Sequence, residues 1–125
     1  MSFIFVLLWM IFFHIVDDFV LQPICLSALK QKSYWQENAP DKQYERDYIW
    51  ALIMHSFSWA FMIMLPVANF YHFNVGYEFT IMFIINVVVH AFVDNMKANW
   101  KVINLWADQF FHLAQILLTF LLVFM

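Results

Sequence analysis

The sequence predicts an all-α protein, a four-helix transmembrane bundle with both termini outside the cytoplasm. Three observations support this fold class. Of the 125 residues, 65% are hydrophobic and only 12% are charged, whereas soluble domains carry about 25% charged residues. Four apolar segments each approach the ~20 residues that a helix needs to cross a bilayer. Lysine and arginine are confined to alternate connections. A chain of this length holds one unit, so we expect residues 1–125 to form a single membrane domain.

The predicted spans fall at about 3–22, 48–67, 77–96 and 105–125. Pro23 directly follows the first span, as expected just past the end of a helix. The first span lacks the positively charged start and the small-residue cleavage site of a signal peptide, so we expect it to stay in the protein. Residues 69–76, which hold the only glycine, and residues 98–104 are predicted as short connections.

Residues 23–47 form the only long polar stretch and are predicted as a cytoplasmic loop. Pro40 and Asp41 are typical of a turn or a helix start within it. Two alternatives stay open for this loop, an ordered lid and a mobile segment. Cys25 is the only cysteine, which excludes an internal disulfide and a CxxC motif.

The basic residues predict the orientation. The first connection carries four of them and the third carries Lys97 and Lys101, whereas the second connection and both ends carry none. Cationic connections stay in the cytoplasm, so the first and third are predicted inside, in a multi-pass protein of the inner (cytoplasmic) membrane. The net charge of −3 and the dispersed basic residues disfavour nucleic-acid binding.

Ionisable residues within the apolar spans predict a functional site. Burying such a group in a membrane costs several kcal/mol, so these groups usually face the protein interior. Three pairs are spaced four residues apart, which places both members on one helix face; they are His14 with Asp18, His90 with Asp94, and Asp108 with His112. His55 stands alone in the second span. At 1.5 Å per residue, all of them lie roughly 5–12 Å from the cytoplasmic interface, which predicts one cluster.

The residue types favour a divalent metal. Imidazole together with carboxylate suits zinc, manganese or iron, and the number of groups allows one or two ions. The predicted ligands are His14, Asp18, His90, Asp94, Asp108 and His112. We prefer Asp18 to Asp17 because it repeats the four-residue spacing. Gln22 and Asn86 continue the same helix faces and are predicted to orient the ligands.

Two residues are predicted to act on a substrate. His55, or one of the aspartates, would be a general base, and Lys97 would hold an anionic group. The alternatives are that His55 only hydrogen-bonds between helices and that Lys97 extends to the lipid headgroups. A metal-free network of aspartate, histidine and lysine is the alternative for the whole cluster.

The motifs His14-x3-Asp18-Phe19-x2-Gln22, His90-x3-Asp94-x2-Lys97 and Asp108-Gln109-x2-His112, together with His55, resemble those of a family of small bacterial membrane proteins. Its members are often encoded in phages and prophages and have no assigned activity. The resemblance covers nearly the whole chain and implies that Gln22, Lys97 and Gln109 also belong to the functional core. The His/Asp pairs are also similar to those of membrane-bound metal-dependent hydrolases.

We therefore expect a metal-dependent hydrolase of a phosphate or ester group, with a lipid as the candidate substrate. The chain has no G-x-S-x-G motif, which disfavours a covalent mechanism. One alternative is an ion or proton transporter or channel, which would require a homo-oligomer because the outer halves of the spans are apolar. The other is a non-enzymatic phage membrane effector with a structural metal.

Overall fold

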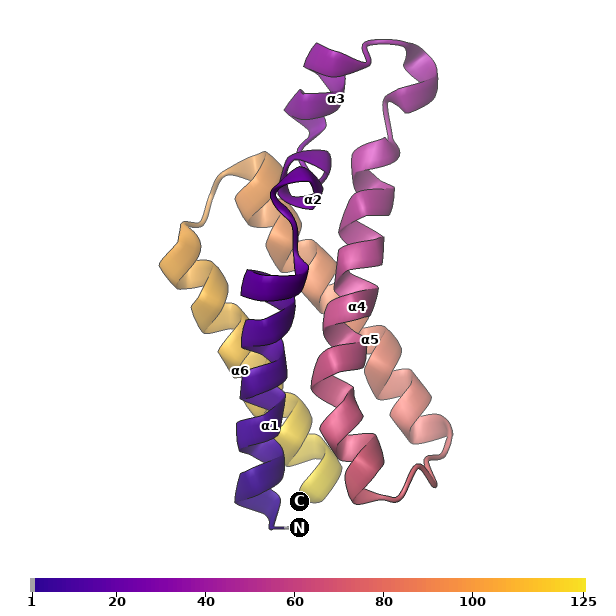
Figure 1. Ribbon diagram of the computed structural model, residues 1–125, viewed down its shortest axis with the longest axis vertical. Helices are drawn as coiled ribbons and strands as arrows, with labels where there is room; N and C mark the ends of the chain where they lie inside the picture. The colour runs from indigo at the N-terminus through magenta and orange to yellow at the C-terminus, as the bar shows by residue number, and fades with distance from the viewer. Residues whose placement is uncertain (1) are drawn as a thin grey trace.

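The computed structural model describes residues 2–125 as a bundle of long helices with a short helical segment at one end (Figure 1). Its elements are α1 (Phe3–Val16), η1 (Asp17–Leu21), α2 (Ile24–Leu29), α3 (Lys32–Asn38), η2 (Lys42–Tyr44), α4 (Asp47–Phe70), α5 (Tyr77–Asn95), η3 (Met96–Trp100) and α6 (Leu105–Phe124).

Four helices are long and apolar enough to cross a membrane, which confirms the predicted helix class and the number of candidate spans. With the turns that continue them, they cover Phe3–Leu21, Lys42–Phe70, Tyr77–Trp100 and Leu105–Phe124. Many large apolar side chains point away from the bundle, such as Trp106, which is 86% exposed, and Ile24, which is 92% exposed. A helix that is apolar on all sides is typical of a membrane span. The chain is thus a candidate multi-pass membrane protein.

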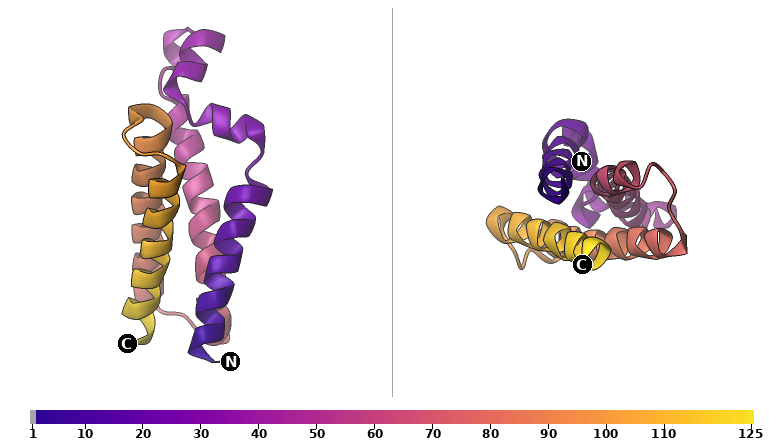
Figure 2. Two further views of the ribbon diagram at one scale, coloured as in Figure 1. Left: turned by 90° about the vertical axis from the view of Figure 1, so that its left-hand side faces the viewer. Right: turned by 90° about the horizontal axis from the view of Figure 1, so that it is seen from below.

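The bundle is built around α4, which packs against α1 and α5, while α6 contacts α1 and α5. Both termini lie at one end, together with the connection between α4 and α5 (Figures 1 and 2). The opposite end carries α2, α3 and the connection between α5 and α6. All six lysines and arginines belong to the segments at this opposite end, so we call it the basic end.

Local sequence explains where the spans begin. The Ser2 hydroxyl accepts a hydrogen bond from the Phe5 amide at the start of α1, and the Asn104 side chain accepts one from the Ala107 amide at the start of α6. Both are standard N-caps, which satisfy amides that lack a helical partner. The second span extends to Phe70, past the predicted end at residue 67, and α4 contains Pro66. Proline lacks an amide hydrogen, so one carbonyl of this helix has no helical donor.

The segment predicted as a polar loop, residues 23–47, contains α2, α3 and η2 and is anchored to the bundle. Asn99 of η3 makes two of the anchoring contacts: its Oδ1 accepts from the Lys32 amide at 2.6 Å, and its Nδ2 donates to the Lys30 carbonyl at 3.0 Å. The Trp35 indole donates to the Leu29 carbonyl at 2.8 Å. The Asn99 bonds hold the segment to the bundle, and the Trp35 bond holds α3 to the end of α2 within it.

The apolar core lies between the basic end and the termini. Its fully buried members come from α1, α4 and α6 and are Val6, Met10, Trp59, Ala60, Ile63, Met64, Val67 and Ile116. This packing agrees with the apolar outer halves of the predicted spans. The polar interior described next lies on the basic-end side of this core.

Candidate metal centre

Four helices bring their ionisable residues together at one depth of the bundle, as their spacing predicts. The residues that meet are His14, Asp17, Asp18, His55, His90, Asp94, Asp108 and His112, which we call the His/Asp cluster. Seven of the eight are at most 3% exposed, and Asp18 has a side-chain exposure of 10%. Such burial of carboxylates is costly unless a cation or hydrogen bonds compensate it.

Two groups within the cluster could hold a metal ion. One consists of Asp18, His55 and His90, and the other of His90, Asp94 and His112; in each, the ligand atoms lie within 4.8 Å of one another. The two groups share His90, so they form one continuous site. His55, expected to act as a base, thus lies among the candidate ligands.

The donor atoms of these groups converge closely. The Nε2 atoms of His55 and His90 are 3.2 Å apart. Nε2 of His55 lies 3.5 Å from Oδ1 of Asp18 and 3.4 Å from Oδ2 of Asp94. Nε2 of His112 lies 3.3 Å from Oδ1 of Asp94 and 3.4 Å from Oδ1 of Asp108. Each carboxylate therefore presents an oxygen to an imidazole nitrogen.

The cluster also holds most of the unpaired polar atoms of the interior. Among residues 2–125, seven buried side-chain nitrogen or oxygen atoms have no hydrogen-bond partner. Six of them belong to the cluster, namely Asp17 Oδ2, Asp18 Oδ1, His90 Nδ1, Asp108 Oδ1, and Nδ1 and Nε2 of His112. Buried polar atoms are normally satisfied, so this concentration indicates a site that interacts with a further group.

A wide helical turn places both Asp17 and Asp18 in the interior. Neighbouring residues of an α-helix point about 100° apart, because a turn contains 3.6 residues. Here α1 passes into the π-turn η1 at Asp17, and both carboxylates face His55: Asp17 Oδ2 lies 3.6 Å from its Nδ1, and Asp18 Oδ1 lies near its Nε2. Ser58 donates to Asp17 Oδ1 at 2.5 Å. Asp17 thus contacts the Nδ1 side of the His55 ring, whereas Asp18 contacts the Nε2 side, which faces His90. Asp18 is therefore the ligand candidate.

His14 has a hydrogen-bond pattern that differs from that of the other histidines. The Trp59 indole, which can only donate, donates to His14 Nδ1 at 2.8 Å. A neutral imidazole then carries its hydrogen on Nε2, which donates to Gln109 Oε1 at 3.0 Å. The Gln109 amide in turn donates to Asp18 Oδ2 and Asp108 Oδ2, both at 3.2 Å. Both nitrogens of His14 are engaged, so His14 orients the site through Gln109 and does not offer a free ligand atom.

Replacing His14 by alanine is therefore expected to weaken metal affinity without removing the site. Loss of a group that orients metal ligands typically costs 10–100-fold in affinity. We expect His14→Ala to bind metal about 10–100-fold more weakly than the wild type, measured by competition with a chelator. Complete loss of metal in His14→Ala, equal to the loss in His90→Ala, would instead make His14 a ligand.

Two lysines pair with the aspartates. Lys30, which is 4% exposed, donates to Asp94 Oδ2 at 2.6 Å and to Gln22 Oε1 at 2.9 Å. Lys97 donates to Asp108 Oδ2 at 2.6 Å and has a side-chain exposure of 34%. The sequence predicted Lys97 for the site but assigned Lys30 only to a charged loop. The feature of the sequence that could have indicated a buried Lys30 is its position directly after the apolar run Ile24–Leu29.

Asn86 belongs to a different polar group. Its Oδ1 accepts hydrogen bonds from Gln115 at 2.8 Å and from Thr119 at 3.1 Å, and its amide donates to the Met82 carbonyl at 3.0 Å. These contacts join α5 to α6 one turn away from His90. The structure thus gives Asn86 a role in helix packing, in place of the predicted contact with the ligands.

Aromatic side chains also surround the cluster. The Trp59 side chain is fully buried. Its ring stacks on His90, with centroids 4.1 Å apart, and His90 stacks on His112 at the same distance. The rings of Trp59 and His112 also lie 5.5 Å apart, so the three rings pack against one another and support the imidazole planes of His90 and His112.

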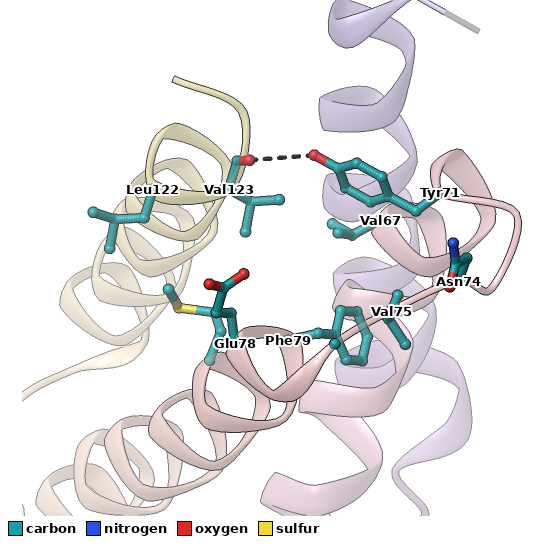
Figure 3. A pocket seen from close by; sticks show the side chains of 10 residues that line it. Val67, Tyr71, Asn74, Val75, Glu78, Phe79, Leu122 and Val123 are labelled. Carbon is teal, nitrogen blue, oxygen red and sulfur yellow. Dashed lines mark hydrogen bonds between the residues drawn. The ribbon is translucent and has the colours of Figure 1, made fainter.

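A small polar pocket adjoins the cluster at the basic end. Its volume is about 170 Å³, and its lining residues are Asp18, Phe19, Gln22, Lys30, Asp94, Lys97, Leu105 and Gln109. A larger pocket of about 400 Å³ lies at the terminal end, between the connection from α4 to α5 and the end of α6 (Figure 3). There the Tyr71 hydroxyl reaches the Val123 carbonyl, and Glu78 supplies a carboxylate. Only the smaller pocket contains members of the His/Asp cluster.

Comparison of the chain with protein-family models, with curated proteins and with solved structures finds no match. The resemblance to small phage-encoded membrane proteins therefore stays a prediction, and the function is inferred from the site itself.

Proposed function

We propose that the protein binds one divalent transition metal in the His/Asp cluster and uses it to hydrolyse a phosphate or ester group, with a membrane lipid as the substrate. The single observation that carries this proposal is the convergence of the donor atoms. In a tetrahedral site with metal–ligand bonds of about 2.1 Å, neighbouring ligand atoms lie roughly 3.4 Å apart. The close pairs between His55, His90, His112 and the aspartates are 3.2–3.5 Å apart.

The charge of the cluster supports a single divalent ion. With the imidazoles neutral, its four aspartates and the two paired lysines leave a net charge of −2 in the bundle interior. Uncompensated charge is strongly disfavoured in such surroundings. One divalent cation balances this charge. The shared ligand His90 also supports a single ion. Its contacts with His55 and Asp94 both use Nε2, which has one lone pair and can bind only one metal.

The residues around the ion suit hydrolysis. A divalent metal polarises a scissile group and activates water at neutral pH. Asp108 lies outside both ligand groups, and Lys97 holds its Oδ2 while its Oδ1 has no hydrogen-bond partner among residues 2–125. We assign Asp108 the role of general base, in place of His55. Zinc, manganese and iron all match a set of imidazole and carboxylate ligands.

A transport function is the second candidate, because acidic and histidine clusters within membranes often mark ion paths. The apolar core argues against it. The eight core side chains, all at most 1% exposed, fill the bundle between the cluster and the terminal end. At this depth Asn86, Gln115 and Thr119 hydrogen-bond to one another, so the layer offers an ion few polar contacts within one chain.

The first test is the metal content of the purified protein. We expect about one equivalent of zinc, manganese or iron per chain in the wild type, as the net charge of −2 requires. His112→Ala and the double variant His90→Ala/Asp94→Ala should lose it, whereas His72→Ala should keep it, because His72 lies in the connection at the terminal end. Metal is measured by plasma mass spectrometry.

The metal-loaded protein is then assayed against phosphate and ester lipids, with chelated protein as the control. Absence of metal from the wild type, or equal metal in all variants, contradicts the metal centre. If metal is bound, no lipid is hydrolysed and chelation unfolds the chain, the metal is structural and the enzyme proposal is wrong.

A further inference from the structure

The pocket at the basic end contains more hydrogen-bond donors than its aspartates use. An ammonium group has three N–H donors. Lys30 uses two of them, on Asp94 and Gln22, and Lys97 uses one, on Asp108. Gln22 accepts with Oε1, which leaves its NH2 group as a donor in the pocket. One donor of Lys30, two of Lys97 and the Gln22 amide therefore remain for a ligand with several acceptor atoms.

The same pocket adjoins the candidate metal ligands. Asp18 and Asp94 line the pocket, and each also belongs to one of the two ligand groups. Asp94 joins the pocket to the cluster, because its Oδ2 accepts from Lys30 and lies 3.4 Å from Nε2 of His55, while its Oδ1 faces Nε2 of His112. A ligand held by the lysines would thus lie directly beside the metal centre.

From this arrangement we propose that Lys30, Lys97 and Gln22 form a subsite for a phosphate group next to the metal. This inference rests on the proposed function and narrows its substrate from phosphate or ester to phosphate. A tetrahedral phosphate has oxygens that diverge toward donors on different segments. Here the donors are Gln22, which follows η1, Lys30, which follows α2, and Lys97 of η3. Lysine is a common partner of phosphate as a compact point charge.

The metal and the phosphate are coupled by charge. With the imidazoles neutral, the cluster and its two lysines carry a net charge of −2, which repels an anion from the pocket. A divalent cation removes this repulsion. Phosphate is therefore expected to bind only to the metal-loaded protein. Two apolar side chains, Phe19 and Leu105, which are 60% and 55% exposed, line the pocket beside these polar groups.

The test is calorimetric titration of inorganic phosphate into the purified full chain, with zinc loaded and with zinc removed. Loss of a charge-assisted hydrogen bond lowers affinity by about 10–100-fold. We expect this loss in Lys97→Gln and an affinity within about twofold of the wild type in Lys101→Gln, an exposed lysine at the same end. Chelation of the zinc should abolish binding. Each sample is also analysed for zinc, which separates the two proposals.

Zinc-loaded wild type that binds no phosphate, or a zinc-loaded Lys97→Gln that binds it as well as the wild type, overturns the subsite and leaves the metal centre standing. If the wild type holds no metal at all, both proposals are wrong. Should Lys97→Gln fail to hold zinc, Gln22→Leu decides: the subsite requires weaker phosphate binding in this variant, and unchanged binding overturns it.

Two further titrations identify the source of the phosphate. One uses glycerol phosphate, which is soluble, and the other uses nanodiscs that contain phosphatidic acid. Preference for the nanodiscs assigns the subsite to a lipid headgroup, and equal binding assigns it to a free phosphate monoester. Binding of neither contradicts the proposal.

Discussion

Replacing Lys30 by methionine is expected to lower the free energy of unfolding by about 3–5 kcal/mol, because it leaves Asp94 buried without its cationic partner. The two side chains are 5% and 3% exposed, and their charged atoms are 2.6 Å apart. The unfolding of chelated protein in mixed micelles measures the change without a contribution from bound metal. Lys32→Met is the matched control, since Lys32 is exposed two residues away and its replacement should change stability by no more than about 0.5 kcal/mol.

A double variant tests whether the loss of stability comes from the unpaired charge of Asp94. Lys30→Met/Asp94→Asn removes both ionic groups and should recover most of the stability that Lys30→Met loses, as a double-mutant cycle would report. If Lys30→Met is no less stable than Lys32→Met, Lys30 does not compensate the charge of Asp94. In that case this ion pair does not hold the segment of residues 23–47 to the bundle.

Trp59→Ala is expected to lower the free energy of unfolding by about 3–5 kcal/mol, because it leaves a large cavity in a packed interior. The Trp59 ring is fully buried, stacks on His90 and donates to His14. Chelator competition should also show metal affinity about 10–100-fold lower, since the imidazole planes lose their support.

Trp106→Ala is the control for this variant, because the Trp106 side chain is 86% exposed on the lipid-facing side of the bundle. Trp59→Phe separates the two contributions of the indole, since phenylalanine can keep the stack on His90 but cannot donate to His14. Equal stability of Trp59→Ala and Trp106→Ala would contradict the buried position of Trp59 and its packing against His90 and His112.

The helices and the convergence of the cluster were predictable from the sequence, for a physical reason. A membrane requires spans of a minimum length, and ionisable groups within the spans must turn inward. The four-residue spacing and the common depth of His14, His90 and His112 then leave one place for them to meet. The confirmed part of the prediction is the part that the bilayer imposes.

The remaining features depend on contacts between segments with no shared periodicity. Lys30 reaches Asp94 across 64 positions of the chain, from a helix of only six residues. The role of His14 depends on which atoms face its two nitrogens, and spacing alone carries no such information. The inward position of Asp17 beside Asp18 depends on the π-turn η1, which interrupts the helical period used to choose between them.

The two ligand groups differ in how much of the chain must be made before each is complete. Asp18, His55 and His90 all precede α6, whereas the group of His90, Asp94 and His112 requires it. A nascent chain that has inserted its first three spans therefore already carries three ligand atoms for a cation. The fourth span brings Asp108 and His112 to a site whose other half is already assembled. If the cluster binds a metal as proposed, the first group supplies its ligands before the last helix is made, and the ion then offsets the charge of Asp108 when that helix joins the bundle.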